Sequence, residues 1–395
     1  MEIFLLFAGI FLFTFFIGIL LEKIRIPWIF ASLILGLVLA FDNPFSELTS
    51  SGTFKFLAWL GMYFLLFLIG FELDLEKIKR LGGFIVKSTF FIILFEAFFG
   101  SLLIHFVFGY SWFLSVLIAL SFATVGEVVL IPILDEFKLT KTKLGQTILG
   151  IGVLDDIIEI FVILIAVLAI PILVGGGLRL DFEIRYSLAV FLSLFFLFLF
   201  VLLLIKVKRK LNLNRIRGIE IFFLFILAIF FLFIGLASYA EAAAIGAILA
   251  GIVVKNLLPK QYISLLESRI KTVTYALFGP IFFFWVGLDA DIDYLIKYPL
   301  LIVLVIVVAK SAKIFASWLI GRKELGLKPS ILMGIALGVR FSSSIVIIKF
   351  LFEKALIRSE LYSVLIASTI AFKFIIPFLL SCLIKKWQRG FSKIN

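Results

Sequence analysis

The sequence of 395 residues is nearly devoid of cysteine and histidine, with Cys382 and His105 as the single residue of each kind. One cysteine excludes an internal disulfide framework, and one histidine excludes a histidine-rich metal site. Charged residues are also scarce, at 16% of the chain, whereas 64% of the residues are hydrophobic and 50 are phenylalanine. Soluble domains are only about half apolar. We therefore predict an all-α polytopic membrane protein.

Apolar runs follow one another along the whole chain, and a helix needs about 20 apolar residues to cross a bilayer. We predict thirteen transmembrane helices at approximately 2–22, 27–41, 55–73, 83–108, 112–134, 144–174, 186–205, 219–237, 239–255, 271–288, 296–321, 330–352 and 361–384. No soluble domain remains between them. The first run ends in charged residues rather than in a small-residue cleavage site, so we interpret it as a retained helix.

The net charge of +12 does not indicate a nucleic-acid partner, because the basic residues lie in short connections between the apolar runs. Lys and Arg are concentrated in alternate connections, as the positive-inside rule describes. This pattern predicts a multi-pass protein of the cell (inner) membrane, whose partner is the lipid bilayer. It places the N-terminus outside and the C-terminus, with a short tail at 386–395, in the cytoplasm.

Two adjacent carboxylates, Asp155 and Asp156, lie near the middle of the apolar run 144–174. A charge at that depth costs about 2.5–3.5 kcal/mol on insertion scales, and adjacent like charges disfavour joint ionisation. The two acids either face water or a basic neighbour, or they form an intramembrane site for a proton, a metal ion, or both in turn. We favour the second interpretation because apolar residues flank the pair on both sides.

Further charged residues lie deep in the predicted helices. The acids are Glu96, Glu127 and Glu159, and the bases are Lys310, Lys313, Arg340 and Lys373. Buried charges of opposite sign usually pair with each other. We therefore expect ion pairs between these helices.

Two predicted helices carry small and polar residues in mid-span. They are Ala123 to Glu127 with Pro132 in the helix 112–134, and Gly334, Gly338 and the serines 342–344 in the helix 330–352. Such residues indicate either unwound helix that lines a cavity or close packing of neighbouring helices. The first six and last six helices form two halves of opposite topology, joined by the helix 186–205. Interruptions at matching positions of inverted halves mark the binding site of a secondary transporter.

Five sequence motifs resemble those of the monovalent cation:proton antiporter-2 family, the sodium/proton and potassium/proton exchangers. They are FLLFLIGFELDLEKIKRLG (64–82), FATVGEVVLIPILDEFKL (122–139), GIGVLDDIIEI (150–160), IGAILAG (245–251) and GPIFFFWVGLDADI (279–292). The resemblance covers nearly all of residues 1–385, as one transmembrane exchanger domain. It implies a homodimer whose mobile core, at about 83–174 and 296–384, contains two crossed broken helices. Scaffold helices would lie at about 1–73 and 219–288, and 186–205 would be the linker.

The resemblance also implies roles for individual residues. Asp156 would carry the cation, Na⁺ or K⁺, and the proton in turn, and Thr124 matches the polar residue of the first break. Asp155 would pair with a lysine that stands nine residues before an arginine; Lys313, nine residues before Arg322, fits better than Lys310. Glu96, Lys310 and Ser342 are further candidates.

Two features depart from the family pattern. Glu127 stands where sodium-selective members have an apolar or small residue, and Arg340 lies in the second break. We expect these two residues to form an ion pair across the crossing helices. Glu159 shares a helix face with both aspartates, and it is either a third ligand or an acid that faces the cytoplasmic entrance.

These residues predict a cation/proton antiporter that works by alternating access, is not an enzyme and needs no cofactor. Hard cations prefer oxygen ligands, and a carboxylate must lose its proton to bind a metal, so cation and proton compete for Asp156. We expect sodium as the cation and electrogenic exchange, in which cation binding breaks an Asp155–Lys313 pair.

The alternatives are a potassium/proton antiporter or potassium efflux transporter of the same family and, from another class, a cation channel. An intramembrane aspartyl protease is disfavoured, because its two aspartates lie on separate helices.

Overall fold

The computed structural model describes residues 2–24, 26–73, 81–123, 130, 134–135, 137–174, 199, 218–239, 242–339 and 342–391. All regular secondary structure in these residues is helical, as predicted. Six of the described helical segments are long and apolar enough to cross a membrane. They are α1 (Glu2–Lys23), α4 (Gly52–Glu72), α6 (Gly83–Phe108), α11 (Ile219–Ser238), the continuous stretch Gln261–Leu288 and α16 (Pro299–Gly321). Of the predicted helix 186–205, only residue 199 is among the described residues, so the count of thirteen and the inverted repeat stay predictions.

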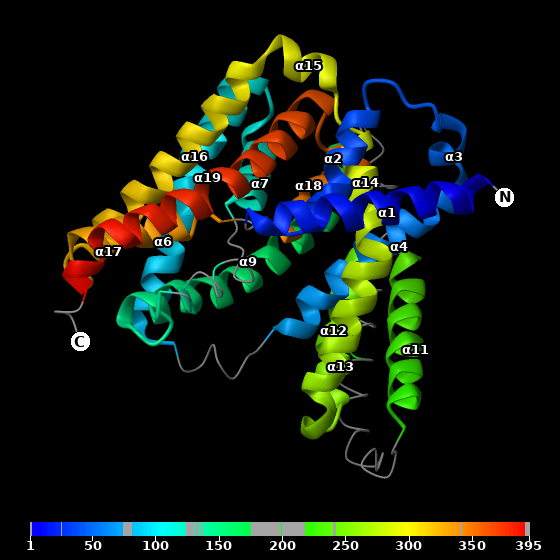
Figure 1. The fold of residues 1–395 in the computed structure, drawn as a ribbon, viewed down its shortest axis with the longest axis horizontal. Helices are drawn as coiled ribbons and strands as arrows, with labels where there is room; N and C mark the ends of the chain where they lie inside the picture. Colours follow the sequence, from blue (N-terminus) through cyan, green and yellow to red (C-terminus); the bar gives the residue numbers. More distant parts are fainter. Residues whose placement is uncertain are drawn as a thin grey trace. The chain divides into compact units, whose positions relative to one another are not determined.

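The chain divides into two compact units (Figure 1). Unit 1 comprises Met1–Phe11, Pro44–Leu73 and Ile163–Trp285, and unit 2 comprises Leu12–Asn43, Asp74–Val162 and Val286–Asn395. Three of the five boundaries between the units fall within helices, namely α1, α9 (Lys143–Val174) and α14 (Gly279–Leu288). Each of these helices therefore contributes residues to both units.

Unit 1 is built on helices that approach each other through glycine. Its remaining helices are α3 (Ser46–Ser50), α12 (Ala243–Leu257) and α13 (Lys260–Thr272), followed by a π-helical turn, η2 (Val273–Phe278). At Gly70 on α4, a Cβ atom would collide with the carbonyl oxygen of Ile248 on α12. At Gly251 on α12, it would collide with the carbonyl oxygen of Phe67. The small-residue motif 245–251 therefore serves close packing of α12 on α4.

The helix that ends unit 1 begins earlier than predicted. The sequence predicts a span from 271, whereas α13 begins at Lys260 and continues through η2 into α14. Within this polar extension, Glu267 forms an ion pair with Lys271 (2.7 Å), and Lys271 also pairs with Glu72 of α4 (2.8 Å). These contacts allow the helix to extend beyond its apolar stretch.

Unit 2 is organised around α16, which packs against α6, α17 (Leu327–Ala336) and α19 (Ser359–Phe391) (Figure 1). Its other helices are α2 (Phe30–Leu39), α7 (Trp112–Phe122), α15 (Ile292–Lys297) and α18 (Ser342–Glu353). At Gly334 on α17, a Cβ atom would lie 2.6 Å from the Cα atom of Ile314 on α16. This close approach brings the lysines of α16 within reach of the end of α17.

The predicted interruption of the helix 330–352 is present, because α17 ends at Ala336 and α18 begins at Ser342. The other predicted interruption begins where α7 ends, at Phe122, and its residues 124–129 lie outside the described part of the chain. The helix α19 continues to Phe391, beyond the predicted end at 384. The short helices α3 and α15 were not predicted, because neither has an apolar run.

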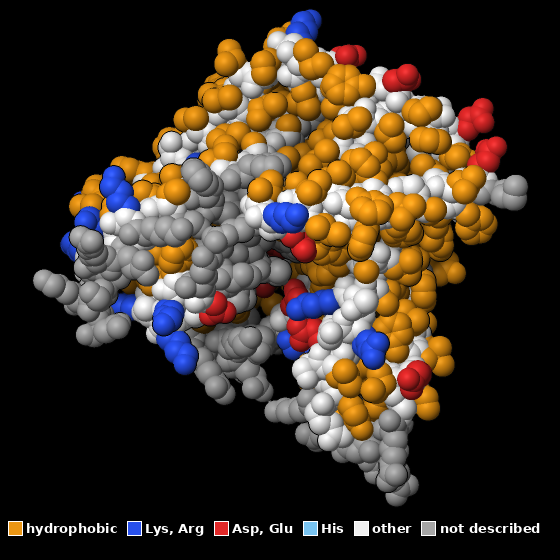
Figure 2. All heavy atoms as spheres, in the orientation of Figure 1, with side chains coloured by type: hydrophobic (Ala, Val, Ile, Leu, Met, Phe, Trp, Pro, Cys, Tyr) orange, Lys and Arg blue, Asp and Glu red, His pale blue; other side chains and the backbone are white. Residues whose placement is uncertain are grey.

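Apolar side chains cover much of the outer surface. On α1, the exposed residues include Phe4, Leu5, Phe15 and Phe16, each with at least 60% of its surface exposed. Figure 2 shows apolar side chains over much of the coloured surface, with the charged side chains in small separate groups. A surface of this kind is expected where helices face lipid.

Candidate functional site

The two aspartates of α9 lie in different environments within unit 2. Asp155 is fully buried, at 0% exposure, whereas Asp156 is only partly buried. Adjacent positions on a helix point about 100° apart, so two neighbouring acids cannot share one direction. The sequence predicts different roles for Asp155 and Asp156, and the two side chains also differ in burial.

Glu159, one helical turn further along α9, is also fully buried. Its Oε1 atom accepts a hydrogen bond from the hydroxyl of Ser343 over 2.8 Å. Ser343 stands in the first turn of α18, directly after the interruption. The contact therefore ties the helix of the aspartates to the segment that restarts after the break.

Lys313 of α16 joins the ends of two helices in unit 2. Its side chain is fully buried, and its Nζ atom donates to the carbonyl oxygens of Ala123 (2.7 Å) and Leu337 (3.1 Å). Ala123 directly follows α7, and Leu337 directly follows α17. The last carbonyl groups of a helix have no partner within it and carry partial negative charge. Lys313 thus supplies a hydrogen-bond donor and positive charge to two helix ends at once.

Lys313 also forms an ion pair with Glu96 of α6. The Nζ and Oε2 atoms are 2.8 Å apart, and the two side chains are 0% and 3% exposed. The contact is close in distance, although it lacks the angles of a directed hydrogen bond. A buried charge is strongly stabilised by an opposite charge at this distance. Glu96, a minor candidate from the sequence, is thus an ionic partner of Lys313.

Lys310, one turn before Lys313, binds the same interruption. Its Nζ atom donates to the carbonyl oxygen of Gly338 over 2.7 Å and lies 3.8 Å from the centre of the Phe372 ring. An ammonium group over an aromatic face is an attractive cation–π arrangement. Both lysines of α16 therefore bind carbonyl groups of the segment between α17 and α18.

Several predicted site residues cannot be placed. Thr124, Glu127 and Arg340 lie outside the described residues, and so does the side chain of Ser342. The ligand role of Thr124 and the Glu127–Arg340 pair therefore stay predictions. The Asp155–Lys313 pair also stays a prediction, because the contacts given above join Lys313 to other groups.

Sequence reasoning did not identify Ser343 as a partner of Glu159, nor Glu96 as a partner of Lys313. The position of Glu96 deep in an apolar run indicates that its charge needs a partner, but it does not indicate which base provides it. For Ser343 the signal was the run of three serines after the break, in which spacing alone does not select one hydroxyl. Both contacts depend on how the helices rotate against each other.

The described part of unit 2 holds three acids on α9, Asp155, Asp156 and Glu159, whose oxygen atoms are of the type that hard cations prefer. It also holds the buried ammonium group of Lys313 at two helix ends. Among the residues that the structure describes, no group of three or more His, Cys, Asp or Glu side chains is placed to hold a metal ion. Buried acids in apolar helices, beside an interrupted helix, are the architecture of an ion-coupled membrane transporter.

The family follows from the sequence profile. Residues 10–386 match the family described as sodium/hydrogen exchanger, transmembrane, so the chain belongs to that family. It is 27% identical to "Probable Na(+)/H(+) antiporter 3" of Methanocaldococcus jannaschii, over 91% of this chain and 90% of that protein. It is 25% identical to "Na(+)/H(+) antiporter" of Enterococcus hirae, over 94% of this chain and 90% of that protein.

Two further comparisons concern the fold and the alternative cation. The fold resembles that of the sodium proton antiporter MjNhaP1 from M. jannaschii, with a TM-score of 0.64 at 14% identity, over 98% of this chain and 97% of that one. The chain also matches the glutathione-regulated potassium-efflux system protein KefC of Klebsiella pneumoniae, at 25% identity. That match covers 67% of this chain but only 42% of KefC.

Proposed function

We propose that the protein is a secondary active antiporter that exchanges a monovalent cation, sodium foremost, for protons across the cell membrane. Membership of the exchanger family and the names of the two relatives matched over most of their length support this activity. The site is supported chiefly by one observation, the buried Asp155 beside the partly buried Asp156 on α9, in the unit where Lys313 binds the ends of two helices.

Asp156 is the shared binding site in this proposal. It is partly buried, whereas Asp155 is fully buried, and we assign the exposed part of Asp156 to the path of the ions. A cation displaces the proton because it binds only the deprotonated carboxylate. Thr124 and backbone carbonyl groups freed at the interruptions supply further oxygen ligands. Competition between the two ions at one carboxylate couples their movements.

Alternating access requires that one part of the chain moves against another. We assign the mobile core to about 83–174 and 296–384, the scaffold to about 1–73 and 219–288, and the linker to 186–205. The protein would act as a homodimer, with its N-terminus outside and its C-terminus in the cytoplasm. The site needs no cofactor, because ion competition involves no bond-making beyond protonation.

The experiment is cation-driven proton flux in proteoliposomes that contain the purified protein. An outward sodium gradient should drive proton uptake, and Asp156→Asn should abolish it. Control vesicles without protein measure the leak. A sodium flux that follows the membrane potential without a counter-flux of protons would indicate a cation channel instead.

The second candidate is potassium/proton exchange or potassium efflux. The match to a potassium-efflux protein favours it, although this chain spans less than half of that protein. Substituting K⁺ or Li⁺ for Na⁺ in the same vesicles separates the two functions. Exchange driven by K⁺ at concentrations where Na⁺ is inactive would establish the alternative.

A further inference from the structure

Lys349 of α18 is a buried base that the proposed ion site does not use. Its side chain is 0% exposed, and its Nζ atom forms ion pairs with Asp289, directly after α14, and with Glu353 (2.6 Å). The ammonium group also lies 5.1 Å from the centre of the Phe352 ring and 5.6 Å from that of Tyr362. The ion pair with Asp289 ties α18 to the end of α14.

Two hydrogen bonds fasten the same end of α14 to α19. The hydroxyl of Tyr362 donates to the carbonyl oxygen of Val286 over 2.7 Å. The last carbonyl groups of a helix have no partner within it, so this one is held from another helix. The backbone N–H of Asp291 donates to the hydroxyl oxygen of Ser363 over 2.6 Å. Three polar contacts therefore join a stretch of six residues, 286–291, to α18 and α19.

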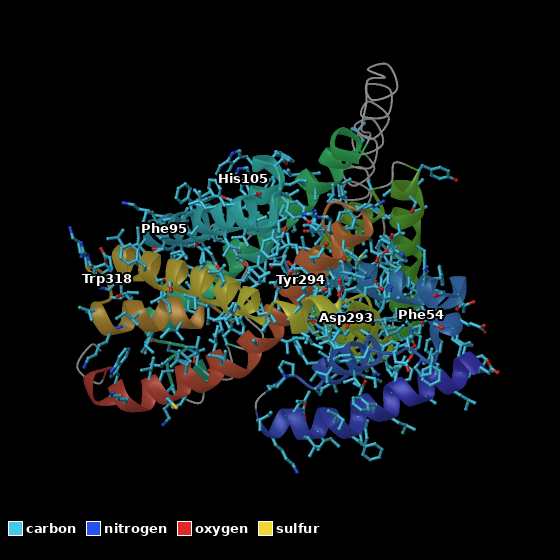
Figure 3. The ribbon with its side chains drawn as sticks, turned by 90° about the horizontal axis from the view of Figure 1, so that it is seen from above. Phe54, Phe95, His105, Asp293, Tyr294 and Trp318 are labelled. Carbon is cyan, nitrogen blue, oxygen red and sulfur yellow. The ribbon has the colours of Figure 1, made fainter. Side chains whose placement is uncertain are left out.

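Two other helices also hold α14. In the part of α14 that belongs to unit 1, the ring of Phe284 lies 6.0 Å from that of Phe54 on α4 (Figure 3). In the part that belongs to unit 2, a Cβ atom at Gly287 would collide with the carbonyl oxygen of Leu33 on α2. The helices α2 and α4 belong to the proposed scaffold, whereas α18 and α19 belong to the proposed mobile core. The three polar contacts therefore cross the border between scaffold and core.

Lys349 can separate from one of its acids and keep the other. Glu353 stands four residues after Lys349 on the same helix, so it stays beside the lysine wherever α18 moves. Asp289 stands on the α14 side, and its side chain is 32% exposed, so water can solvate the carboxylate after separation. The large cost of a buried charge without a partner is thereby avoided. This ion pair is suited to open and close repeatedly.

We propose that Lys349 is a positioning residue for alternating access, which forms a latch between the mobile core and the scaffold. The latch consists of the Lys349–Asp289 ion pair and the two hydrogen bonds made by Tyr362 and Ser363. It is closed in this structure, and it opens when the core moves, while Lys349 keeps Glu353. The inference rests on the proposed function and adds the contact that holds one of its two states.

The latch lies at the helix ends that the charge pattern predicts to face outside. The connections after α14 and after α18, at 289–295 and 353–360, contain few Lys and Arg residues. A closed latch therefore shuts the outer entrance. The apparent affinity for a ligand falls with the fraction of protein in the competent state. The latch should thus weaken binding of the cation from outside and strengthen binding from inside.

The first test is cation/proton exchange in right-side-out and everted membrane vesicles that contain wild type or Lys349→Met. Loss of the ion pair shifts the equilibrium toward the open latch, so the KM for the cation should fall several-fold at the outer face and rise several-fold at the inner face. A variant that is only less stable would lower the maximal rate without opposite shifts. Lys349→Arg keeps the charge and should keep both values. Lys143→Met, which breaks an exposed ion pair with Glu324, is the matched control and should also keep them.

The second test is a covalent bond across the latch, in a background with Cys382→Ser. Asp291→Cys/Ser363→Cys places two thiols where the N–H of 291 and the hydroxyl of 363 are 2.6 Å apart. Oxidation, or a short bis-methanethiosulfonate linker where the direct bond does not form, should stop exchange. Dithiothreitol should restore it. The two single cysteine variants, treated in the same way, should keep their rates.

Each outcome bears on the inference. Continued exchange by the cross-linked protein overturns it, and so do KM values in Lys349→Met that stay unchanged or shift in the same direction. If Lys349→Met does not fold, the cross-linked protein alone decides. If neither reagent joins the two cysteines, residues 291 and 363 are not held together and the inference fails. Absence of cation-driven proton flux in wild-type vesicles of either orientation overturns the proposed function instead.

Discussion

The hydroxyl of Ser343 donates a hydrogen bond to the Oε1 atom of Glu159 over 2.8 Å. It joins the first turn of α18 to α9, one helical turn beyond the aspartate pair. Because Glu159 is fully buried, its carboxyl oxygens depend on partners within the protein. The contact therefore links the geometry of the interrupted helix to that of the acids on α9.

Replacing Ser343 by alanine removes this bond and should weaken both stability and cation binding. A hydrogen bond to a carboxyl group contributes about 1–3 kcal/mol, and we expect a loss of that size in the free energy of unfolding. Because the orientation of α9 is loosened, the KM for the cation should rise several-fold. Thermal unfolding in detergent and initial rates in proteoliposomes measure the two effects. Ser343→Thr retains the hydroxyl and should behave nearly as the wild type, and an alanine variant with unchanged KM would refute the link.

Replacing Lys313 by methionine should destabilise the protein far more than the same change at Lys310. Removing Lys313 leaves Glu96 as a buried charge without this cation and two helix-end carbonyl groups without this donor. Loss of one partner of a buried ion pair costs about 3–5 kcal/mol. Lys310→Met loses one carbonyl contact and one ring contact, at about 1–2 kcal/mol. Equal shifts in the unfolding temperature of the two variants would contradict the central place given to Lys313.

Replacing Gly70 by alanine should force α4 and α12 apart. The added methyl group would collide with the carbonyl oxygen of Ile248, which belongs to helix backbone and cannot move alone. Overpacking of this kind costs about 1–3 kcal/mol. Gly235→Ala on α11 is the control, since nothing lies within 4 Å of the new Cβ atom, and it should stabilise slightly through higher helix propensity. The comparison is made by thermal unfolding, and equal stability of the two variants would disprove the close approach.

Replacing Lys349 by methionine should loosen the end of unit 2 where α18 meets the segment after α14. Lys349 is fully buried and forms ion pairs with Asp289 and, at 2.6 Å, with Glu353. The two acids are 32% and 20% exposed, so water compensates part of the loss, and we expect about 1–3 kcal/mol. Asp289→Asn should cost less, because Glu353 still pairs with the lysine. Thermal unfolding compares the two variants. A larger loss of stability in Asp289→Asn than in Lys349→Met would contradict this prediction.

Much of the helical layout could be predicted from the sequence, because long apolar runs are a strong signal. The predicted helix 83–108 coincides with α6, and the interruption between Ala336 and Ser342 follows from two glycines and three serines. The start at Lys260 was missed because charged residues lowered the apolar signal, whereas in the fold one of them, Glu267, pairs with Lys271. Hydrophobic runs therefore predict the apolar part of a helix well, but they do not predict the polar turns that extend it.

The choice of partners within the site could not be predicted. The sequence identifies Lys313 as a deep base, but its ion pair with Glu96 depends on the rotation of α6 and α16 about their axes. Likewise, three consecutive serines follow the interruption, and the direction of the first turn of α18 decides that Ser343 reaches Glu159. Residue type and spacing define the candidates, and tertiary packing selects among them.

The central claim is that Asp156 binds cation and proton in turn. It is tested most directly by sodium-driven proton flux in proteoliposomes with wild type and Asp156→Asn side by side, after both proteins are shown to be folded by thermal unfolding. We predict flux in the wild type that saturates with sodium and falls as protons compete at low pH, and no flux in the variant. Sodium-driven exchange by Asp156→Asn at a rate near that of the wild type would contradict the account.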